Sequence, residues 1–498
     1  MRSCILLSLG LLGSALAQTT SVDTYVATES PIAKAGLLAN IGPNGSKSSG
    51  AKAGVVIASP STSNPNYLYT WVRDSSLVFK VLVDQYTAGT DTSLRGLIDD
   101  FVTAEATLQQ VTNPSGSVDT GGLGEPKFNI DETAFTDPWG RPHVTLWPII
   151  QLDLNYVANF WNQSTFDLWE EVDSSSFWTT AVQHRSLREG SSLATRIGQT
   201  SSVASYKAQA DNLLCFLQTY WNPSGHYITA NTGGGRSGID SNTVLASIHT
   251  FDPAAGCDAS TFQPCSDKAL SNLKAYVDSF RSIYSINNGI ASNGAVATGR
   301  YPEDVYQGGN PWYLSTMAVA EQLYDALYVW DTQDSLTVTP ISLPFFQLFD
   351  SAIQSGTYSS SSSAFTTLTS AIRTFADGFI AIHAKYTPSG GALAEQFTKS
   401  NGAPTSAVDL TWSYAAALTG FAARSATNVA SWGAAGLTVP AVCNSNSGPT
   451  VSVTFNVDAT TVLGENIYIT GSVDALSNWS PDSALELSPA SYPTWSST

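Results

Sequence analysis

A helix that is apolar on nearly every side constrains the fold of this chain more than any other feature. Residues 77 to 83 read Leu-Val-Phe-Lys-Val-Leu-Val, and only Lys80 interrupts the apolar run. Such a helix must be buried on most sides. The next helical segment instead carries a single apolar stripe at positions i, i+3, i+4 and i+7, formed by Leu94, Leu97, Ile98 and Phe101. We therefore interpret the two segments as the inner and outer members of one helical hairpin.

The same helical character continues over most of the chain. From about Ser30 to Ser431, helical patterns alternate with long loops that contain Gly and Pro, and strand patterns are nearly absent. Further helices are predicted over residues 147–161, 177–197, 203–221, 313–331, 365–385 and 406–423. The main part of the chain is thus predicted to be all-α.

The pattern changes after Cys443. Residues 444–449 read Asn-Ser-Asn-Ser-Gly-Pro, which is typical of a short linker. Beyond it, apolar and polar residues alternate, which predicts a β tail. The apolar positions are Val451, Val453, Phe455, Val457, Ile467 and Ile469. About 50 residues with two or three strands are marginal for an independent β domain.

The first seventeen residues have the layout of a secretory signal. Met1-Arg2 precedes an apolar stretch from Cys4 to Leu12, and Ala15-Leu16-Ala17 forms a small-residue cleavage site. No later apolar run approaches the roughly 20 residues that span a bilayer. The mature protein is expected to begin at Gln18 and to be secreted.

Four cysteines remain after Cys4 is removed with the signal. They are Cys215, Cys257, Cys265 and Cys443, and an even number in an oxidising compartment indicates disulfides with three possible pairings. The short loop between Cys257 and Cys265 favours local closure, which leaves Cys215 for Cys443. A metal site is the rival interpretation, but no CxxC spacing or His cluster supports it. The sequons at Asn44, Asn162 and Asn478 are candidate glycan sites.

Charge composition excludes several classes of partner. The net charge is −18, and only 12% of the residues are charged. Nucleic acid and anionic membranes are therefore poor partners. A Ser/Thr-rich chain with 13 Trp instead suits a neutral, hydroxyl-rich ligand, because sugar faces stack on aromatic rings.

Three carboxylates within five residues mark a candidate catalytic segment. Residues 167–171 read Asp-Leu-Trp-Glu-Glu. Like charges this close are expected to raise one another's pKa, so that one carboxyl stays protonated and acts as an acid beside an aromatic platform. Cleavage of a glycosidic bond needs a second carboxylate on the opposite face of the sugar, and Glu395 is the candidate.

Several long motifs occur in one order. They are residues 67–74 (Tyr-Leu-Tyr-Thr-Trp-Val-Arg-Asp), 124–128 (Gly-Glu-Pro-Lys-Phe), 139–142 (Trp-Gly-Arg-Pro), 167–171, 299–304 (Gly-Arg-Tyr-Pro-Glu-Asp), 308–312 (Gly-Gly-Asn-Pro-Trp), 395–396 (Glu-Gln) and 409–412 (Asp-Leu-Thr-Trp). On these motifs the chain resembles the fungal glucoamylases of glycoside hydrolase family fifteen, over nearly all of residues 25–443. The resemblance implies an all-α (α/α)6 barrel whose active site lies among the inter-helix loops.

The resemblance also implies a role for each matching residue. Glu170 would be the general acid and Glu395 the general base of an inverting reaction, with the two carboxyls roughly 6.5 to 9.5 Å apart. Asp167 would be a further participant in catalysis or would only tune Glu170. Arg73 and Asp74 would hold the terminal glucose by charge-assisted hydrogen bonds. The expected aromatic walls are Tyr67, Trp139, Trp169, Trp312 and Trp412, and the expected polar contacts at the neighbouring sugar are Glu171, Arg300 and Asp304.

The implied activity is the release of β-glucose from the non-reducing ends of starch and related α-1,4-glucans. It would need no metal and no organic cofactor, and the protein is expected to be a monomer. Taken singly, these residues would be read differently: a lone Arg-Asp is usually a surface ion pair and a lone Trp is usually core. Their joint occurrence is what favours the site.

The tail from Thr450 resembles the first part of a starch-binding module of carbohydrate-binding family twenty. The similarity lies in residues 464–468 (Gly-Glu-Asn-Ile-Tyr) and 476–479 (Leu-Ser-Asn-Trp), and Trp479 matches a starch-contacting tryptophan. The tail has about half the length of such a module, so we expect a partial β-sandwich with exposed strand edges and little starch binding. The expected organisation is a signal peptide at 1–17, a catalytic domain at 18–443, a linker at 444–449 and a truncated starch-binding domain at 450–498.

One departure from the family pattern concerns the barrel itself. Only His143-Val144-Thr145-Leu146 separates Pro142 from the segment that starts at Trp147, where the family has roughly 30 more residues. About one helix is therefore expected to be missing, and a closed ring cannot lose a helix without opening or rearranging. Either the chain is an ordinary enzyme with a skipped segment, or it is an inactive, non-catalytic secreted paralogue that still binds carbohydrate.

Overall fold

The computed structural model describes residues 22–118, 122–137, 149–427, 430–441, 443, 454–462, 464–470, 476 and 484–497. The chain divides into two compact units, Met1–Cys443 and Asn444–Thr498. Each unit is considered by itself.

The larger unit is built of helices. Residues 22–39 form the first, and the others are α2 (Val72–Thr87), α3 (Arg95–Gln109), α4 (Ile149–Phe160), α5 (Phe177–Arg196), α6 (Val203–Gln218), α7 (Ser241–His249), α8 (Asp267–Ser279), α9 (Tyr313–Thr332), α10 (Leu343–Phe346), α11 (Ser363–Tyr386) and α12 (Thr411–Arg424). All of the predicted helices are confirmed, with ends that differ by a few residues. The helix expected from residue 406 begins at Thr411, because Pro404–Thr405 belongs to a strand and Asp409 has a φ of 49°.

Four of the described helices were not predicted from the sequence. These are residues 22–39, α7, α8 and α10. The reason is clear for α7, which has only nine residues and begins with the polar run Ser241-Asn242-Thr243. All of its residues up to Ile248 are buried, so that no polar face gives the periodic signal on which a sequence prediction depends.

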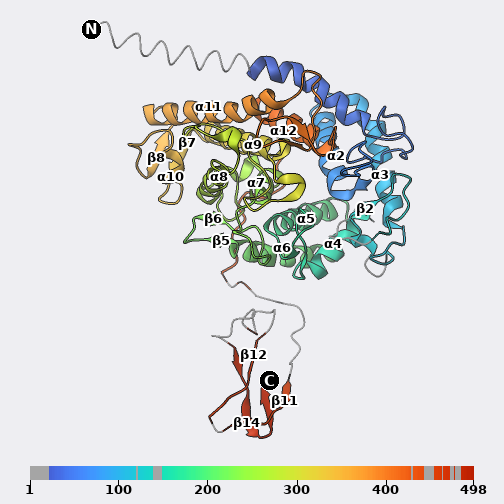
Figure 1. The fold of residues 1–498 in the computed structure, drawn as a ribbon, viewed down its shortest axis with the longest axis vertical. Coiled ribbons are helices and arrows are strands. Elements are labelled where there is room, and N and C mark those ends of the chain that lie inside the picture. Colours follow the sequence, from blue (N-terminus) through green and yellow to red (C-terminus); the bar gives the residue numbers. More distant parts are fainter. Residues whose placement is uncertain are drawn as a thin grey trace. The chain divides into compact units, whose positions relative to one another are not determined.

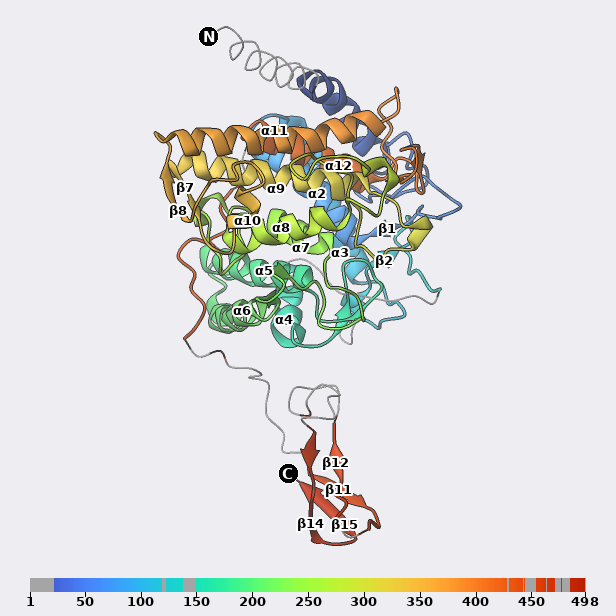
Figure 2. The same cartoon turned by 60° about the vertical axis from the view of Figure 1, so that its left-hand side comes forward.

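The helices form an inner ring and an outer layer. In the inner ring α2 packs against α12, α12 against α9, α9 against α7, and α7 against α5. The outer helices pack on these, with α3 on α2, α6 and α4 on α5, α8 on α7, and α11 on α9. Figures 1 and 2 both show α11 lying along α9, with α7 and then α5 on the side of α9 that faces away from α11. The inner and outer roles predicted for the first helical pair are confirmed, since α2 buries residues on several sides and α3 only along one stripe.

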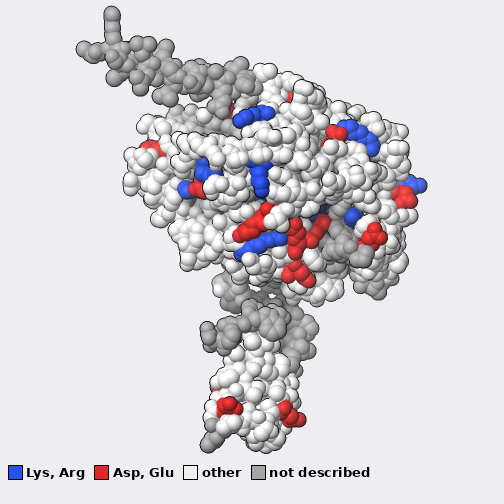
Figure 3. All heavy atoms as spheres, viewed as in Figure 1, with Lys and Arg blue, Asp and Glu red and all other residues white. Residues whose placement is uncertain are grey.

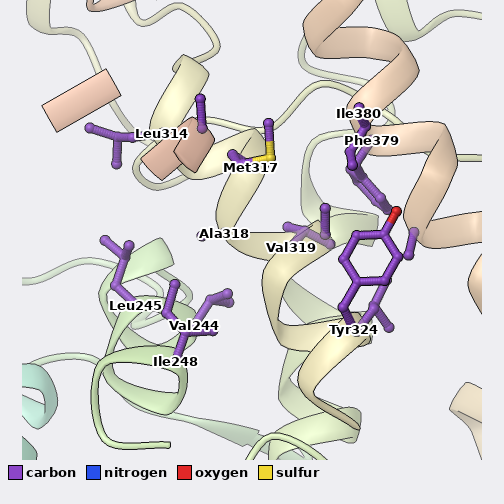
Figure 4. Close-up of a cluster of buried hydrophobic side chains, with 14 of the residues drawn as sticks. Val244, Leu245, Ile248, Leu314, Met317, Ala318, Val319, Tyr324, Phe379 and Ile380 are labelled. Atoms are coloured by element: carbon purple, nitrogen blue, oxygen red, sulfur yellow. The ribbon is translucent and has the colours of Figure 1, made fainter. Parts of the chain in front are cut away.

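The core lies between the inner helices and the outer layer. Almost every residue of α9 is buried, which is why its sequence shows no polar face. Figure 4 shows side chains from three neighbouring helices meeting around it: Val244, Leu245 and Ile248 of α7, Leu314, Met317, Ala318, Val319 and Tyr324 of α9, and Phe379 and Ile380 of α11.

The strands of the larger unit are short antiparallel pairs in the loops. They are β1 (Thr70–Trp71) with β2 (Lys127–Phe128), β3 (Thr165–Phe166) with β4 (Asp173–Ser174), β5 (Trp221–Asn222) with β6 (Tyr227–Ile228), β7 (Ser335–Val338) with β8 (Gly356–Ser359), and β9 (Gln396–Phe397) with β10 (Pro404–Thr405). These strand pairs fix the geometry of the loops between helices.

The smaller unit contains only strands as regular elements in its described residues. One sheet has the order β11 (Phe455–Asp458), β15 (Thr494–Ser497), β14 (Ser488–Ser491), and a second pairs β12 (Tyr468–Ile469) with β13 (Leu485–Glu486). The β character predicted for Phe455, Val457 and Ile469 is confirmed. Val451, Val453 and Trp479 lie outside the described residues.

Both predicted disulfides are present. Cys257 is bonded to Cys265, and Cys215 on α6 is bonded to Cys443 at the end of the larger unit. The sequon residues Asn44 and Asn162 are exposed, whereas Asn478 lies outside the described part. Figure 3 shows that most of one face is uncharged, in keeping with the low charge content of the sequence, and that acidic and basic side chains gather near the middle of the larger unit.

The missing helix is expected immediately after Pro142, and residues 138–148 lie outside the described part of the chain. The described chain ends at Asp137 and resumes with α4 at Ile149.

Asp153 of α4 and Glu105 of α3 form a buried pair of acids. Neither has an ion-pair partner in the described structure, and both carboxyl oxygens of Asp153 are buried without a hydrogen bond. Burial, together with the charge of Glu105, raises the pKa of Asp153 to about 9, and burial raises the pKa of Glu105 to about 8. The pair is therefore most easily accommodated in its protonated form.

This pair predicts a stability that decreases as the pH rises. The folded pKa values exceed the unfolded ones, so the native state keeps protons that the unfolded state releases, and stability falls from about pH 4 through the folded pKa values near 8 and 9. Asp153→Asn is expected to raise the unfolding free energy at pH 8 by a few kcal/mol and to change it little at pH 4. Thermal unfolding at both pH values measures this, and equal effects at pH 4 and pH 8 would contradict it.

Candidate active site

The expected site residues lie where the chain enters the inner helices. Arg73 is in the first turn of α2, Trp312 precedes α9, and Trp412 is in the first turn of α12. Glu170 lies in the hairpin loop before α5, and Asp240 caps the N-terminus of α7. Because all of these helix N-termini belong to the inner ring, residues far apart in the sequence meet at one end of the barrel.

The loop that carries Glu170 is organised by Asp167. The strands β3 and β4 pair Phe166 with Asp173, so residues 167–172 form the connecting loop. Asp167 is almost fully buried, and its Oδ1 accepts hydrogen bonds from the backbone N–H groups of Glu171 (2.9 Å) and Val172 (3.2 Å). Its Oδ2 accepts one from Asn231 Nδ2 at 3.0 Å. With its oxygens engaged in this way, Asp167 holds the shape of the loop.

Glu170 occupies a left-handed backbone conformation with a φ of 62°. A non-glycine residue in this region costs of order 1–3 kcal/mol and persists only where its surroundings hold it. Here the backbone N–H of Glu170 donates to the carbonyl of Asp167 at 2.9 Å. This turn directs the side chain to Arg73, whose Nη1 lies 2.8 Å from Glu170 Oε1.

The pKa of Glu170 is raised, but not for the reason that the sequence suggested. Burial raises it, Arg73 opposes the shift, and the acid that adds to it is Asp74. The expectation of mutual repulsion within residues 167–171 is wrong, because Asp167 is hydrogen-bonded into the loop and Glu171 is paired with arginines. The side chain of Glu170 is 15% exposed, so it is mostly desolvated and still accessible.

Arg73 and Asp74 form a fixed pair at the start of α2. Arg73 Nε and Nη2 both lie 2.9 Å from Asp74 Oδ1, and Nη1 also donates to the carbonyl of Leu168 at 2.9 Å. The guanidinium lies over the ring of Trp412, 5.2 Å from its centroid. The pair therefore joins the start of α2 to the loop of Glu170 and to α12.

Glu395 lies directly before β9 and is 1% exposed. Its Oε2 accepts hydrogen bonds from Ser406 Oγ and, at 3.3 Å, from Gln396 Nε2. Burial raises the pKa of Glu395 to about 7, and hydrogen bonds from Ser406 and Tyr67 moderate the shift. Tyr67 is itself hydrogen-bonded to Tyr306 through the two hydroxyls at 2.6 Å.

Ser406→Ala is expected to move the acidic limb of the pH–rate profile upward. The serine hydroxyl stabilises ionised Glu395, so its removal raises the pKa of that carboxyl, by about 0.5 to 1 unit for a hydrogen bond worth roughly 1 kcal/mol. The profile of kcat/KM for maltose against pH measures this shift. Ser361→Ala on the surface is the control, and an unchanged limb in Ser406→Ala would contradict the role given to Ser406.

Glu171 is held between two arginines. Its carboxylate lies 2.9 Å from Arg300 Nη1 and 2.7 Å from Arg236 Nη2, and it accepts a hydrogen bond from Tyr301. Burial would raise the pKa of Glu171, but Arg300, Tyr301 and Arg236 together lower it. Arg300 is in turn bound by both oxygens of Asp304, at 2.6 and 2.9 Å. The surroundings of Glu171 therefore favour its ionised form, whereas burial raises the pKa of Glu170.

Arg236 was not predicted from the sequence. It lies in a loop of residues 233–238 with three glycines at positive φ, and its guanidinium stacks 3.9 Å from the ring centroid of Tyr301. A Gly-rich loop before a helix is a weak signal, which is why Arg236 was missed. Ser406 and Tyr306 were missed as well, since only the fold brings them to Glu395.

Arg236→Gln is expected to raise KM for maltose about fivefold, or roughly 1 kcal/mol, with a smaller change in kcat. The reason is that Glu171 keeps Arg300 but loses the second cation that fixes its carboxylate. Steady-state kinetics separate the two parameters. Arg236→Lys should recover part of the loss, and a fall in kcat at unchanged KM would contradict this assignment.

Aromatic rings line the same region. Trp169 lies 5.6 Å from Trp312 and 6.2 Å from Trp412, measured between ring centroids, and Arg300 packs against the faces of Trp169 and Trp312. Trp169 Nε1 donates to Asp240 Oδ1 at 2.8 Å. Trp312 Nε1 is buried and has no hydrogen-bond partner among the residues that the structure describes. Trp139, the remaining expected wall, lies outside the described residues.

Within the described part, no group of three or more His, Cys, Asp or Glu side chains is placed to hold a metal ion. At one end of the helical barrel, two buried carboxyl groups with raised pKa values lie among tryptophans and paired arginines. Such a site is suited to binding and cleaving a carbohydrate.

Comparisons with known proteins agree with this class. The sequence model of "Glycosyl hydrolases family 15" matches residues 31–144 and 142–422, and that of "Starch binding domain" matches residues 450–498. Glucoamylase-1 of Schizophyllum commune is 60% identical over 523 aligned positions, which cover 98% of this chain and 90% of the relative. Glucoamylase of Neurospora crassa is 47% identical, covering 96% of this chain and 87% of the relative.

A solved structure described as a glycoside hydrolase family 15 glucoamylase from Hypocrea jecorina has a TM-score of 0.83 and 46% identity. The match covers 96% of this chain and 91% of that one. The chain therefore belongs to glycosyl hydrolase family 15. The resemblance seen in the sequence and the (α/α)6 barrel class are confirmed.

Proposed function

We propose that this protein is an exo-acting, inverting glucan 1,4-α-glucosidase that releases β-D-glucose from the non-reducing ends of starch and related α-1,4-glucans. The observation that carries the proposal is the pair of buried carboxyl groups, Glu170 and Glu395, whose pKa values are both raised by burial. The named relatives are glucoamylases, and this supports the same reaction.

In this mechanism Glu170 protonates the glycosidic oxygen while Glu395 activates a water on the opposite face of the sugar. Burial favours a protonated Glu170, which is what a general acid needs, and the hydrogen bonds from Ser406 and Tyr67 favour an ionised Glu395. Asp167 acts as a positioning residue, because three donors already engage its carboxylate.

The sugar-binding roles follow from the same contacts. Arg73 and Asp74 bind the terminal glucose hydroxyls, which restricts the enzyme to chain ends. Tyr67, Trp169, Trp312 and Trp412 provide the ring-stacking walls, together with Trp139. Glu171, Arg300 and Asp304 bind the adjoining sugar, and the unpartnered Trp312 Nε1 is a donor for a sugar hydroxyl.

The protein is proposed to be a secreted monomer that binds starch and α-glucans. Residues 1–17 would be the signal peptide, 18–443 the catalytic domain and 444–449 a linker, and residues 450–498 would belong to a starch-binding domain. The two disulfides support an oxidising compartment, and in the described residues no helix has the length and apolar character to cross a bilayer.

Glucose release from soluble starch by the full chain, followed by polarimetry, tests the proposal. Downward mutarotation would indicate an α product and a retaining reaction, and upward mutarotation a β product and inversion. The alternative is an inactive carbohydrate-binding paralogue, which would bind maltose but release no glucose. No observation on the described site favours that alternative.

A further inference from the structure

A cavity of about 120 Å³ lies between the inner helices α2, α7, α9 and α12. We call it the barrel cavity. Its inner end is lined by Leu314 and Trp412, which are the second residues of α9 and α12, and its outer end by the exposed residues Thr90 and Thr427. Along α12 the lining extends from Trp412 to Ala423, a length of about 16 Å. The barrel cavity is therefore a narrow passage that runs from the far end of the helices to Trp412.

Most of the wall of the barrel cavity is apolar. Figure 4 shows part of it, with Leu245 and Ile248 of α7 opposite Leu314 and Ala318 of α9. Ala415 of α12 lines the same space. Burial of hydrocarbon against such a wall is favourable, because it removes apolar surface from water. The wall therefore suits an unbranched hydrocarbon chain.

A buried carboxyl group faces the barrel cavity without a partner. Asp325 of α9 lines the cavity and is only 6% exposed, and no hydrogen bond or ion pair joins it to another residue that the structure describes. Glu321 lies one turn earlier on α9 and also lines the cavity, where its Oε2 accepts a hydrogen bond from Thr419. Side chains at i and i+4 of a helix are neighbours, so a single cation can contact both acids.

The charges around Asp325 do not supply that cation. Lys80 of α2 is the only cation among the described lining residues, and its Nζ is paired with Asp84 Oδ2 at 2.7 Å. His249 of α7 is neutral, because burial is the largest of the effects that lower its pKa to about 3. Burial and the charge of Glu321 raise the pKa of Asp325, and Lys80 only opposes this shift. Three carboxyl groups thus share one lysine, and a buried carboxylate without a counter-charge is costly.

We propose that the barrel cavity is a binding site for a primary alkylammonium ion with a short, unbranched chain. The ammonium group contacts Asp325 and Glu321, and the chain lies along the apolar wall toward Trp412. Such a ligand supplies the counter-charge and fills the apolar space together, which neither a bare metal ion nor a neutral sugar does. Because the Arg73 guanidinium lies 5.2 Å from the ring centroid of Trp412, the bound chain reaches a residue that also belongs to the candidate active site.

Calorimetric titration of hexylamine into the full chain at pH 7, where the amine is protonated, tests the proposal. We expect saturable one-to-one binding, and an affinity that rises by about fourfold for each methylene group added from propylamine to pentylamine. 1-Hexanol has the same chain without the charge and should bind about tenfold more weakly. Asp325→Asn should weaken the binding of hexylamine by about tenfold and leave the binding of 1-hexanol unchanged.

Two further variants complete the design. Asp331→Asn changes an exposed acid on the same helix and should leave the affinity for hexylamine unchanged. Ala415→Leu narrows the apolar part of the cavity and should weaken the binding of hexylamine more than that of propylamine. Thermal unfolding shows whether each variant is folded, and Tm of the wild type should rise with hexylamine concentration. The comparison of hexylamine with 1-hexanol on the wild type needs no variant.

Three results would overturn the proposal. Equal affinities for hexylamine and 1-hexanol would show that the cavity recognises no charge. Undiminished binding of hexylamine by folded Asp325→Asn would show that Asp325 is not the contact. Complete displacement of hexylamine by saturating maltose would assign the amine to the candidate active site. Because these measurements follow binding and unfolding, they do not depend on whether the chain releases glucose.

Discussion

Glu170→Gln is expected to lower kcat for glucose release from soluble starch by about 10³-fold, within the range that general acid–base groups contribute. Gln keeps the shape of the side chain, and its amide oxygen can still accept the hydrogen bond from Arg73 Nη1, but it has no acidic proton to give to the leaving oxygen. The loss therefore falls on the transition state and much less on the bound sugar. Initial rates of glucose release at saturating starch measure it.

Maltose binding by Glu170→Gln is measured alongside its rate of glucose release. Because Trp169 and Trp412 lie beside the loop of Glu170, maltose should change the intrinsic tryptophan fluorescence. We expect the Kd for maltose to change by less than threefold in Glu170→Gln. Glu189→Gln, an exposed acid paired with Arg185, controls for the loss of a carboxylate elsewhere. If wild type and Glu170→Gln release glucose equally slowly, Glu170 is not the acid.

Glu395→Gln is expected to lower kcat to a similar extent, by about 10²- to 10⁴-fold, because the water attacking the anomeric carbon would no longer lose its proton to a base. Its pH dependence distinguishes it from Glu170→Gln. A base must be ionised, so activity in the wild type falls as the pH drops below the pKa of Glu395, which burial raises to about 7 in the unliganded site. Glu395→Gln should lose this acidic limb and keep the alkaline one.

The profile of kcat/KM against pH, measured for both variants with maltose, tests the two assignments together. Ser406→Ala provides an independent check, because it should shift the limb that Glu395→Gln removes. If Glu395→Gln keeps an unchanged acidic limb, another group is the general base. The roles proposed for Ser406 and Tyr67 would then be wrong as well.

The helical architecture was predictable because burial leaves a periodic signature in the sequence. The all-apolar segment at residues 77–83 and the striped one after Leu94 indicated an inner and an outer helix, and α2 and α3 have these positions. The same reasoning failed for α7, which is short and buried on all sides. The cysteine spacing was sufficient for both disulfides, since a loop of eight residues closes easily on itself.

The candidate site was predictable only in part. Motif resemblance selected Glu170, Glu395, Arg73 and Arg300, and the fold brings the motifs together at the N-terminal ends of the inner helices. The resemblance did not reveal what raises or lowers the pKa values of these residues. The raised pKa of Glu170 was attributed to Asp167 and Glu171, whereas burial is the largest cause and those two acids are engaged by other donors.

The sequence by itself therefore determined the helical class, the two disulfides, the change to strands after Cys443 and the chemistry-bearing motifs, because each depends on residues that are close in the chain or on its local periodicity. The tertiary structure alone decided which carboxyl is buried, which is paired with arginine and which organises a loop. It also revealed Ser406 and Arg236 at the site and, among the described residues, the buried carboxyl of Asp153 on α4 without a hydrogen-bond partner. Desolvation and charge pairing depend on what lies within a few ångströms in space, and in a ring of helices those neighbours come from segments hundreds of residues apart.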